Sequence, residues 1–269
     1  MAANRRFTAV TACGDDPVHR LADGAEHAIA FDEEAFDVSV MRGFEWNTRK
    51  LRFAYNSPST PTEIWDYDMA ARTRVLRKTQ EIPSGHVKAD YVVRRTVALA
   101  ADGARIPLTI LHHRNTPIDG TAPALLYGYG AYGITMPAGF AASRLPLVDR
   151  GLVYCIAHIR GGQERGRQWY LDGKLEKKQN TFTDFARAAE ALVEQKFAAP
   201  GRIVMEGRSA GGLLVGAVYN QRPELFAGAI GGVAFVDVMT TMSDGELPLT
   251  PPEWTEWGNP ITSKAAFDW

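Results

Sequence analysis

The chain has 269 residues, of which 45% are hydrophobic and 23% are charged. This composition excludes an intrinsically disordered protein and supplies enough apolar surface for one large core or two smaller ones. With 30 basic and 31 acidic residues the net charge is -1, so no overall field favours nucleic acid or an anionic membrane. No segment approaches the roughly 20 apolar residues of a membrane span, and we expect a cytoplasmic protein without a membrane partner.

Cysteine and histidine give no sign of a metal, a cofactor or a disulfide framework. Cys13 lies in a polar segment and Cys155 in an apolar one, which predicts a small core residue at the second position. His112 and His113 are adjacent, but no third ligand stands at a suitable spacing. We therefore expect no metal site and no cofactor.

The first third of the chain is predicted to be antiparallel β-structure. Short strand-like runs alternate with turn residues, and helical periodicity is missing. The expected strands cover residues 27–31, 36–41, 50–55, 62–68 and 74–78. This spacing is typical of a meander, and we interpret residues 1–88 as the last blade or blades of a β-propeller, too few to close a ring.

Residues 89–269 are predicted to form part of an α/β domain. A hairpin over 91–100 and 105–113 turns at Asp102-Gly103, a pair suited to positive φ angles. Buried strands then alternate with helices, which is the α/β pattern. The expected strands are 125–129, 152–159 and 202–206. The clearest helix is expected to begin near Thr181, where Thr181-x-x-Asp184 fits a capping box.

Directly after the third strand the chain reads Gly207-Arg208-Ser209-Ala210-Gly211, followed by an apolar helix over 213–220. The pattern G-x-S-x-G between a strand and a helix predicts a nucleophile elbow, in which the serine is strained and exposed at the sheet edge. Glycines on both sides leave room for the sharp turn. The helix N-terminus supplies amide donors for an oxyanion, with Ala210 first. A phosphate-binding loop is disfavoured because the lysine of that motif is missing.

Other candidate residues have plain interpretations when taken from the residues alone. Tyr129 fits a packed aromatic at the end of a strand. Glu253 and Glu256 fit solvated charges in a loop. Both interpretations remain open at this level.

Six segments resemble the prolyl oligopeptidase family, and within it the oligopeptidase B branch, in order and spacing. They are 127–132 (YGYGAY), 160–162 (RGG), 207–212 (GRSAGG), 220–226 (NQRPELF), 235–242 (FVDVMTTM) and 253–260 (EWTEWGNP). The resemblance extends from about Lys50 to Asn259. It implies a propeller joined to an α/β-hydrolase domain that cuts oligopeptides, in this branch after Arg or Lys.

The same resemblance assigns roles to individual residues. Ser209 is implied to be the nucleophile, and Tyr129 and the Ala210 amide are implied to form the oxyanion hole. Glu253 is implied to hold the basic side chain of the substrate, which agrees with the charge-assisted hydrogen bonds of carboxylates. Phe235 and Tyr132 are implied to line the same pocket.

The sequence also departs from the branch. Thr255 stands where some members have a second acid, and Pro137 and Gly139 replace acidic residues of members that favour paired basic sites. We therefore expect cleavage after single basic residues, with little preference for a second one. 

The triad of such hydrolases runs serine, acid, histidine along the chain, yet all six histidines precede Ser209. Asp237 follows Ser209, but we expect it to be structural. We expect these residues to be a truncated form or internal fragment that is inactive or nearly so alone. An α/β-hydrolase esterase or acylaminoacyl-type peptidase, and a non-catalytic remnant that binds basic peptides, are the alternatives.

Overall fold

The computed structural model describes residues 2–3, 7–9, 17–20, 25–43, 45 and 48–268. Two compact units are formed, one by Met1–Arg94 with Pro137–Pro146 and the other by Arg95–Met136 with Leu147–Trp269. Segment 137–146 joins the first unit because the Phe140 amide donates to Asn56 Oδ1 at 2.9 Å and its ring lies edge-on to His86. The expected domain boundary after residue 88 stays a prediction.

The first unit contains two four-stranded antiparallel sheets with strands in chain order. The first sheet comprises β1 (Ala2–Ala3), β2 (Phe7–Ala9), β3 (Pro17–Arg20) and β4 (Glu26–Ala28). The second comprises β5 (Asp37–Val40), β6 (Lys50–Asn56), β7 (Glu63–Asp68) and β8 (Thr73–Thr79). In β6, Leu51, Phe53 and Tyr55 alternate with more exposed residues and enter an aromatic core, as expected for a half-buried strand.

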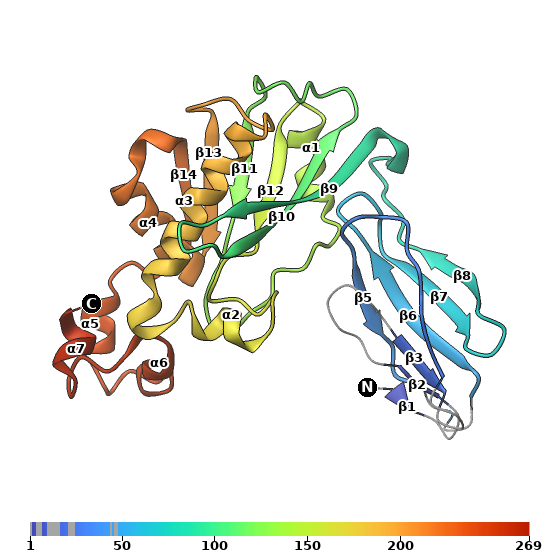
Figure 1. The fold of residues 1–269 in the computed structure, drawn as a ribbon, viewed down its shortest axis with the longest axis horizontal. Helices are drawn as coiled ribbons and strands as arrows, with labels where there is room; N and C mark the ends of the chain where they lie inside the picture. Colours follow the sequence, from blue (N-terminus) through green and yellow to red (C-terminus); the bar gives the residue numbers. More distant parts are fainter. Residues whose placement is uncertain are drawn as a thin grey trace. The chain divides into compact units, whose positions relative to one another are not determined.

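The second unit is built on a six-stranded sheet with the order β14-β13-β11-β12-β10-β9 (Figure 1). Its strands are β9 (Tyr91–Leu99), β10 (Arg105–His113), β11 (Ala124–Tyr127), β12 (Val153–Ala157), β13 (Ile203–Arg208) and β14 (Phe226–Gly232). The four strands β11 to β14 run parallel, and β10 runs antiparallel to β12. The α/β class is therefore confirmed for this unit.

The hairpin turn at Asp102-Gly103 is confirmed, since Gly103 has φ +84 and the Ala100 amide bonds the Ala104 carbonyl. Ile106, Leu108 and Ile110 point to one face and are fully buried. Cys155 is also buried in this core, as predicted.

Seven α-helices and four 3-10 turns are found in the described residues. The α-helices are α1 (Leu145–Val148), α2 (Arg167–Leu171), α3 (Gln179–Glu194), α4 (Ala210–Gln221), α5 (Val238–Met242), α6 (Thr250–Trp257) and α7 (Lys264–Asp268). The 3-10 turns are η1 (Lys88–Asp90), η2 (Ala142–Arg144), η3 (Leu175–Lys177) and η4 (Pro223–Leu225). Helices α3 and α4 pack together, and α4 packs on β13 and β14.

The capping box predicted at Thr181 is wrong. Helix α3 begins at Gln179, and Thr181 is fully buried with its hydroxyl donating to the Arg160 carbonyl at 2.9 Å. Asp184 is also fully buried and receives the Arg160 guanidinium at 2.6 and 2.8 Å. The two polar residues therefore join α3 to the segment that follows β12, because a buried charge requires a partner.

Candidate active site

Ser209 occupies a strained turn between β13 and α4. Its backbone has φ 55 and ψ -120, a region that side chains with a Cβ rarely adopt. Three backbone hydrogen bonds hold it there: its amide donates to Gly232 at 2.9 Å, and its carbonyl accepts from Gly212 at 2.8 Å and Phe235 at 3.1 Å. The residue is exposed, so its hydroxyl is available to a ligand.

The two glycines of the motif are required by close backbone contacts. A Cβ on Gly207 would lie 2.0 Å from the Gly211 carbonyl oxygen, and a Cβ on Gly211 would lie 2.8 Å from the Gly128 carbonyl oxygen. Any larger residue would therefore force the backbone apart. The strand, turn and helix geometry predicted from the sequence is confirmed.

Tyr129 lies beside the serine. Burial raises the pKa of the Tyr129 phenol, against the opposing effect of the Ser209 side chain close by, so the phenol stays protonated at neutral pH. Ala210 is the first residue of α4, where amides have no acceptor within the helix. A phenol and a helix-terminal amide are thus both next to the Ser209 hydroxyl.

A row of aromatic rings extends from Tyr129. Tyr129 and Tyr132 have ring centroids 6.4 Å apart, Trp257 meets Tyr132 edge-on at 5.7 Å, and Phe235 lies 5.6 Å from Trp257. All four rings share one apolar cluster with Ala210. The structure therefore brings together the site residues predicted from separate parts of the chain.

Glu253 belongs to the same group. Its Oε2 accepts from Trp257 Nε1 at 3.2 Å, while the same N–H also donates to the Tyr132 hydroxyl at 3.1 Å. Burial, with Glu253 close by, raises the pKa of Tyr132. Glu253 is half-buried, so a carboxylate stands at the edge of the aromatic cluster.

The interpretation of Glu253 and Glu256 as solvated loop charges is wrong. Both lie on α6, and Glu256 is only 1% exposed. Its carboxylate accepts from the Tyr170 hydroxyl at 2.8 Å and faces Lys178 Nζ at 3.3 Å. Pro251 and Pro252, in the first turn, are the signal that could have revealed this helix.

Asp237 has the structural role expected of it, because its carboxylate accepts from the Thr240 amide at the start of α5. His158 Nε2 is 2.8 Å from the Thr109 hydroxyl, between β12 and β10. Over the described residues, no group of three or more histidine, cysteine, aspartate or glutamate side chains is arranged to hold a metal ion.

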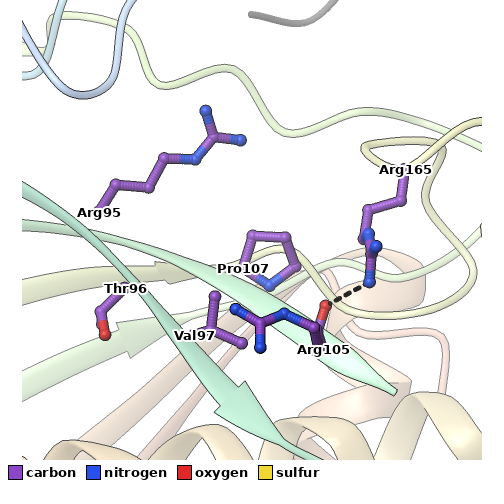
Figure 2. Close-up of a pocket in the computed structure, with 6 residues that line it drawn as sticks. All are labelled: Arg95, Thr96, Val97, Arg105, Pro107 and Arg165. Carbon is purple, nitrogen blue, oxygen red and sulfur yellow. Dashed lines mark hydrogen bonds between the residues drawn. The ribbon is translucent and has the colours of Figure 1, made fainter. Parts of the chain in front are cut away.

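A separate cavity of about 280 Å³ lies on the β9 and β10 side of the sheet (Figure 2). Arg95, Arg105 and Arg165 surround it, and Arg165 donates to the Arg105 carbonyl at 3.0 Å. None of the predicted site residues lines it. Its lining is basic, and its hydroxyl-bearing residue, Thr96, donates to Gln195 Oε1 at 2.7 Å.

The parallel sheet and the strained serine between strand and helix define an α/β protein with the elbow geometry of serine hydrolases. Residues 139–269 match the prolyl oligopeptidase family. Over these residues the chain belongs to this family of serine peptidases.

Known proteins resemble nearly the whole chain. It is 43% identical over 249 residues to dipeptidyl aminopeptidase BI of Pseudoxanthomonas mexicana, covering 92% of this chain and 34% of the relative. It is 38% identical to Protease 2 of Moraxella lacunata, covering 91% of this chain and 36% of the relative. The solved structure of oligopeptidase B from Trypanosoma brucei, with covalently bound antipain, is 40% identical with a TM-score of 0.89, covering 100% of this chain and 39% of that one. The chain thus spans little more than a third of the length of these relatives.

Proposed function

We propose that this chain carries the acylation site of a serine peptidase that cleaves oligopeptides after Arg or Lys. The observation that carries the proposal is the exposed, strained Ser209 at the start of α4, with the Tyr129 phenol close to its side chain. Membership of the family supports the reaction class. The carboxylate of Glu253 beside aromatic rings supports the basic specificity.

The reaction begins with attack of Ser209 Oγ on the carbonyl carbon of the peptide bond. The hydroxyl proton passes to a general base, and the carbonyl oxygen becomes an oxyanion. The C–N bond then breaks, the amine leaves with that proton, and water releases the acyl group from the serine. Tyr129 and the Ala210 amide donate to the oxyanion, where one well-placed donor contributes about 10²–10³ in rate.

The pocket of Glu253, Tyr132 and Phe235 would receive the basic side chain. The aliphatic stem of Arg or Lys would pack on the rings, and the charged end would meet Glu253. Trp257 fixes the carboxylate by donating to it at 3.2 Å. Thr255, on the exposed side of α6, offers no second charge, which favours single basic residues.

The general base of such hydrolases is a histidine that follows the serine along the chain. Each histidine precedes Ser209, whereas the hydrolase order places it after the serine. We propose that the 269 residues alone bind substrates but acylate very slowly, since an unactivated hydroxyl is a weak nucleophile.

The two antiparallel sheets of the first unit have the strand number of propeller blades. We propose that residues 1–88 belong to such a propeller. Among the described residues, no helix is long and apolar enough to cross a membrane. We propose that the protein acts in the cytoplasm.

Binding of peptide aldehydes tests the function without requiring fast turnover. We expect a peptidyl argininal and lysinal to bind about tenfold or more tightly than the norleucinal and prolinal analogues, because only the first two can pair with Glu253. Glu253→Gln should remove this preference and leave norleucinal binding unchanged. The exposed Glu246→Gln is the matched control. A preference for prolinal, or an unchanged preference in Glu253→Gln, would contradict the proposal.

One relative carries the name of a dipeptidyl aminopeptidase, which releases dipeptides from a free N-terminus. Dipeptidyl argininal with a free amine and with an acetylated amine separates this mode from internal cleavage. Equal affinity supports an oligopeptidase, and loss of binding on acetylation supports the aminopeptidase mode.

A further inference from the structure

Lys178 is a buried cation beneath the proposed site. It immediately precedes α3 and follows η3, and its residue is only 4% exposed. The ammonium nitrogen lies 2.6 Å from the Gly130 carbonyl, 3.2 Å from the Gly173 carbonyl and 3.3 Å from Glu256. An ammonium has three N–H donors, so all of them have an acceptor here.

A buried ammonium requires partners of this kind, because burial removes its contacts with water. Transfer of an unpaired ammonium from water to a protein interior costs several kcal/mol. A methionine could fill the same volume without that cost. A methionine, however, could not make the three directed bonds by which the lysine holds its partners.

Those partners belong to two walls of the proposed site, the oxyanion segment at Tyr129 and helix α6 at Glu253. Gly130 follows Tyr129, so its carbonyl is part of the backbone that places the phenol next to Ser209. Glu256 is on α6, three residues after Glu253 and next to Trp257. The Lys178 ammonium also lies 4.7 Å from the centroid of the Trp257 ring.

We propose that Lys178 is a positioning residue that links the oxyanion segment at Tyr129 to the α6 wall at Glu253, so that binding of a basic side chain and placement of the oxyanion donors are coupled. The inference rests on the proposed function. Glu256 is the partner that transmits the link, because it joins Lys178 to α6.

The charge state of Lys178 gives the link a dependence on pH. Burial lowers the pKa of Lys178 to about 8, against the opposing effect of Glu256. Three other titratable groups surround it. The Tyr170 hydroxyl donates to Glu256, and the Lys174 ammonium donates to the Tyr170 hydroxyl. Glu253 accepts from Trp257. Burial and Glu256 raise the pKa of Tyr170, so Lys178 is the group expected to lose its proton first above neutral pH.

The first measurement compares two ligands. Agmatine can bind only at Glu253, whereas a peptidyl argininal contacts both Glu253 and the oxyanion donors. We expect Lys178→Met to weaken argininal by about tenfold and agmatine by less than about threefold, since only argininal needs the two walls in register. Lys178→Arg should recover part of the loss. Lys177→Met, which removes an exposed lysine paired with Asp172, should change neither ligand. An equal loss for both ligands, or no loss in folded Lys178→Met, would overturn the link.

The second measurement does not depend on the function. The indole N–H resonance of Trp257, assigned with Trp257→Phe, should shift with a midpoint near the Lys178 pKa in the wild-type chain and not in Lys178→Met. If Lys178→Met fails to fold, Glu256→Gln tests the same link by the same resonance and the same two ligands. A Trp257 indole resonance that does not shift with pH in the wild-type chain overturns the inference. Failure of wild-type argininal to bind better than norleucinal, with the shift present, overturns the proposed function instead.

Discussion

The elbow at Ser209 and the wall made by α6 are held in different ways. The elbow at Ser209 is fixed by the backbone, through three main-chain hydrogen bonds and two glycines with no room for a Cβ. The wall made by α6 is fixed by side chains, through the bonds of Trp257, Glu253 and Tyr132 and the buried pair of Glu256 with Lys178. 

This difference predicts how each wall responds to change. Backbone contacts between glycines cannot relax without moving a strand against a helix, so the elbow should fail as a whole. Side-chain contacts can be removed one at a time, so the α6 wall should weaken in steps. The elbow therefore sets whether the site exists, and the α6 wall sets what it prefers.

The largest effect is expected from Gly207→Ala. The new Cβ would meet the Gly211 carbonyl oxygen at 2.0 Å, and we expect a loss of about 4 kcal/mol or more in unfolding free energy. Urea unfolding measures it. Gly228→Ala is the matched control, because a Cβ there meets nothing within 4 Å. Similar stabilities of the two variants would show that the elbow is not held by this contact.

A somewhat smaller effect is expected from Trp257→Ala. The ring is 4% exposed and touches Tyr132, Phe235 and the Lys178 ammonium, so its removal should cost about 3–4 kcal/mol and weaken argininal binding. Thermal unfolding and the aldehyde affinity measure the two parts. Trp254→Ala removes a half-buried neighbour on the same helix and should cost less. An unchanged affinity for argininal in Trp257→Ala would show that α6 is not part of the site.

Tyr129→Phe should leave the fold intact and reduce aldehyde binding by about 1.5–3 kcal/mol, the range for a hydrogen bond to a charged group. The loss should be similar for argininal and norleucinal, because the phenol faces the oxyanion and not the side chain. A loss confined to argininal would place Tyr129 in the basic pocket instead.

The smallest effect is a dependence of stability on pH. Lys178 has a pKa of about 8 in the folded chain against 10.5 for an ordinary lysine. Between these values the unfolded chain binds the proton and the folded chain does not, so the unfolding free energy should rise with pH by at most about 1.4 kcal/mol per unit. Urea unfolding between pH 8 and 9.5 measures the rise, and Lys178→Met should lack it. The affinity for argininal should fall over the same pH range. An affinity that rises together with the unfolding free energy would contradict the link through Lys178.

The same difference between the elbow and the α6 wall explains what could be predicted from the sequence. The elbow is local: Gly207, Ser209 and Gly211 lie within five residues, and their spacing alone predicts the turn. The resemblance to a family indicated Tyr129 and Glu253 across more than a hundred residues. Neither source revealed Lys178, because its partners Gly130 and Glu256 come together only in the folded chain. Thr181 and Asp184 matched a capping box by spacing, but burial beside Arg160 decided their roles.

The central claim is that Ser209 and the two walls act on one ligand. The most direct measurement is the ¹³C NMR spectrum of a peptidyl argininal labelled at its aldehyde carbon and bound to the 269-residue chain. The account predicts a hemiacetal resonance that is lost in Ser209→Ala and weakened in both Tyr129→Phe and Glu253→Gln. A hemiacetal that persists in Ser209→Ala, or a spectrum that shows only free aldehyde and its hydrate with the wild-type chain, would contradict it.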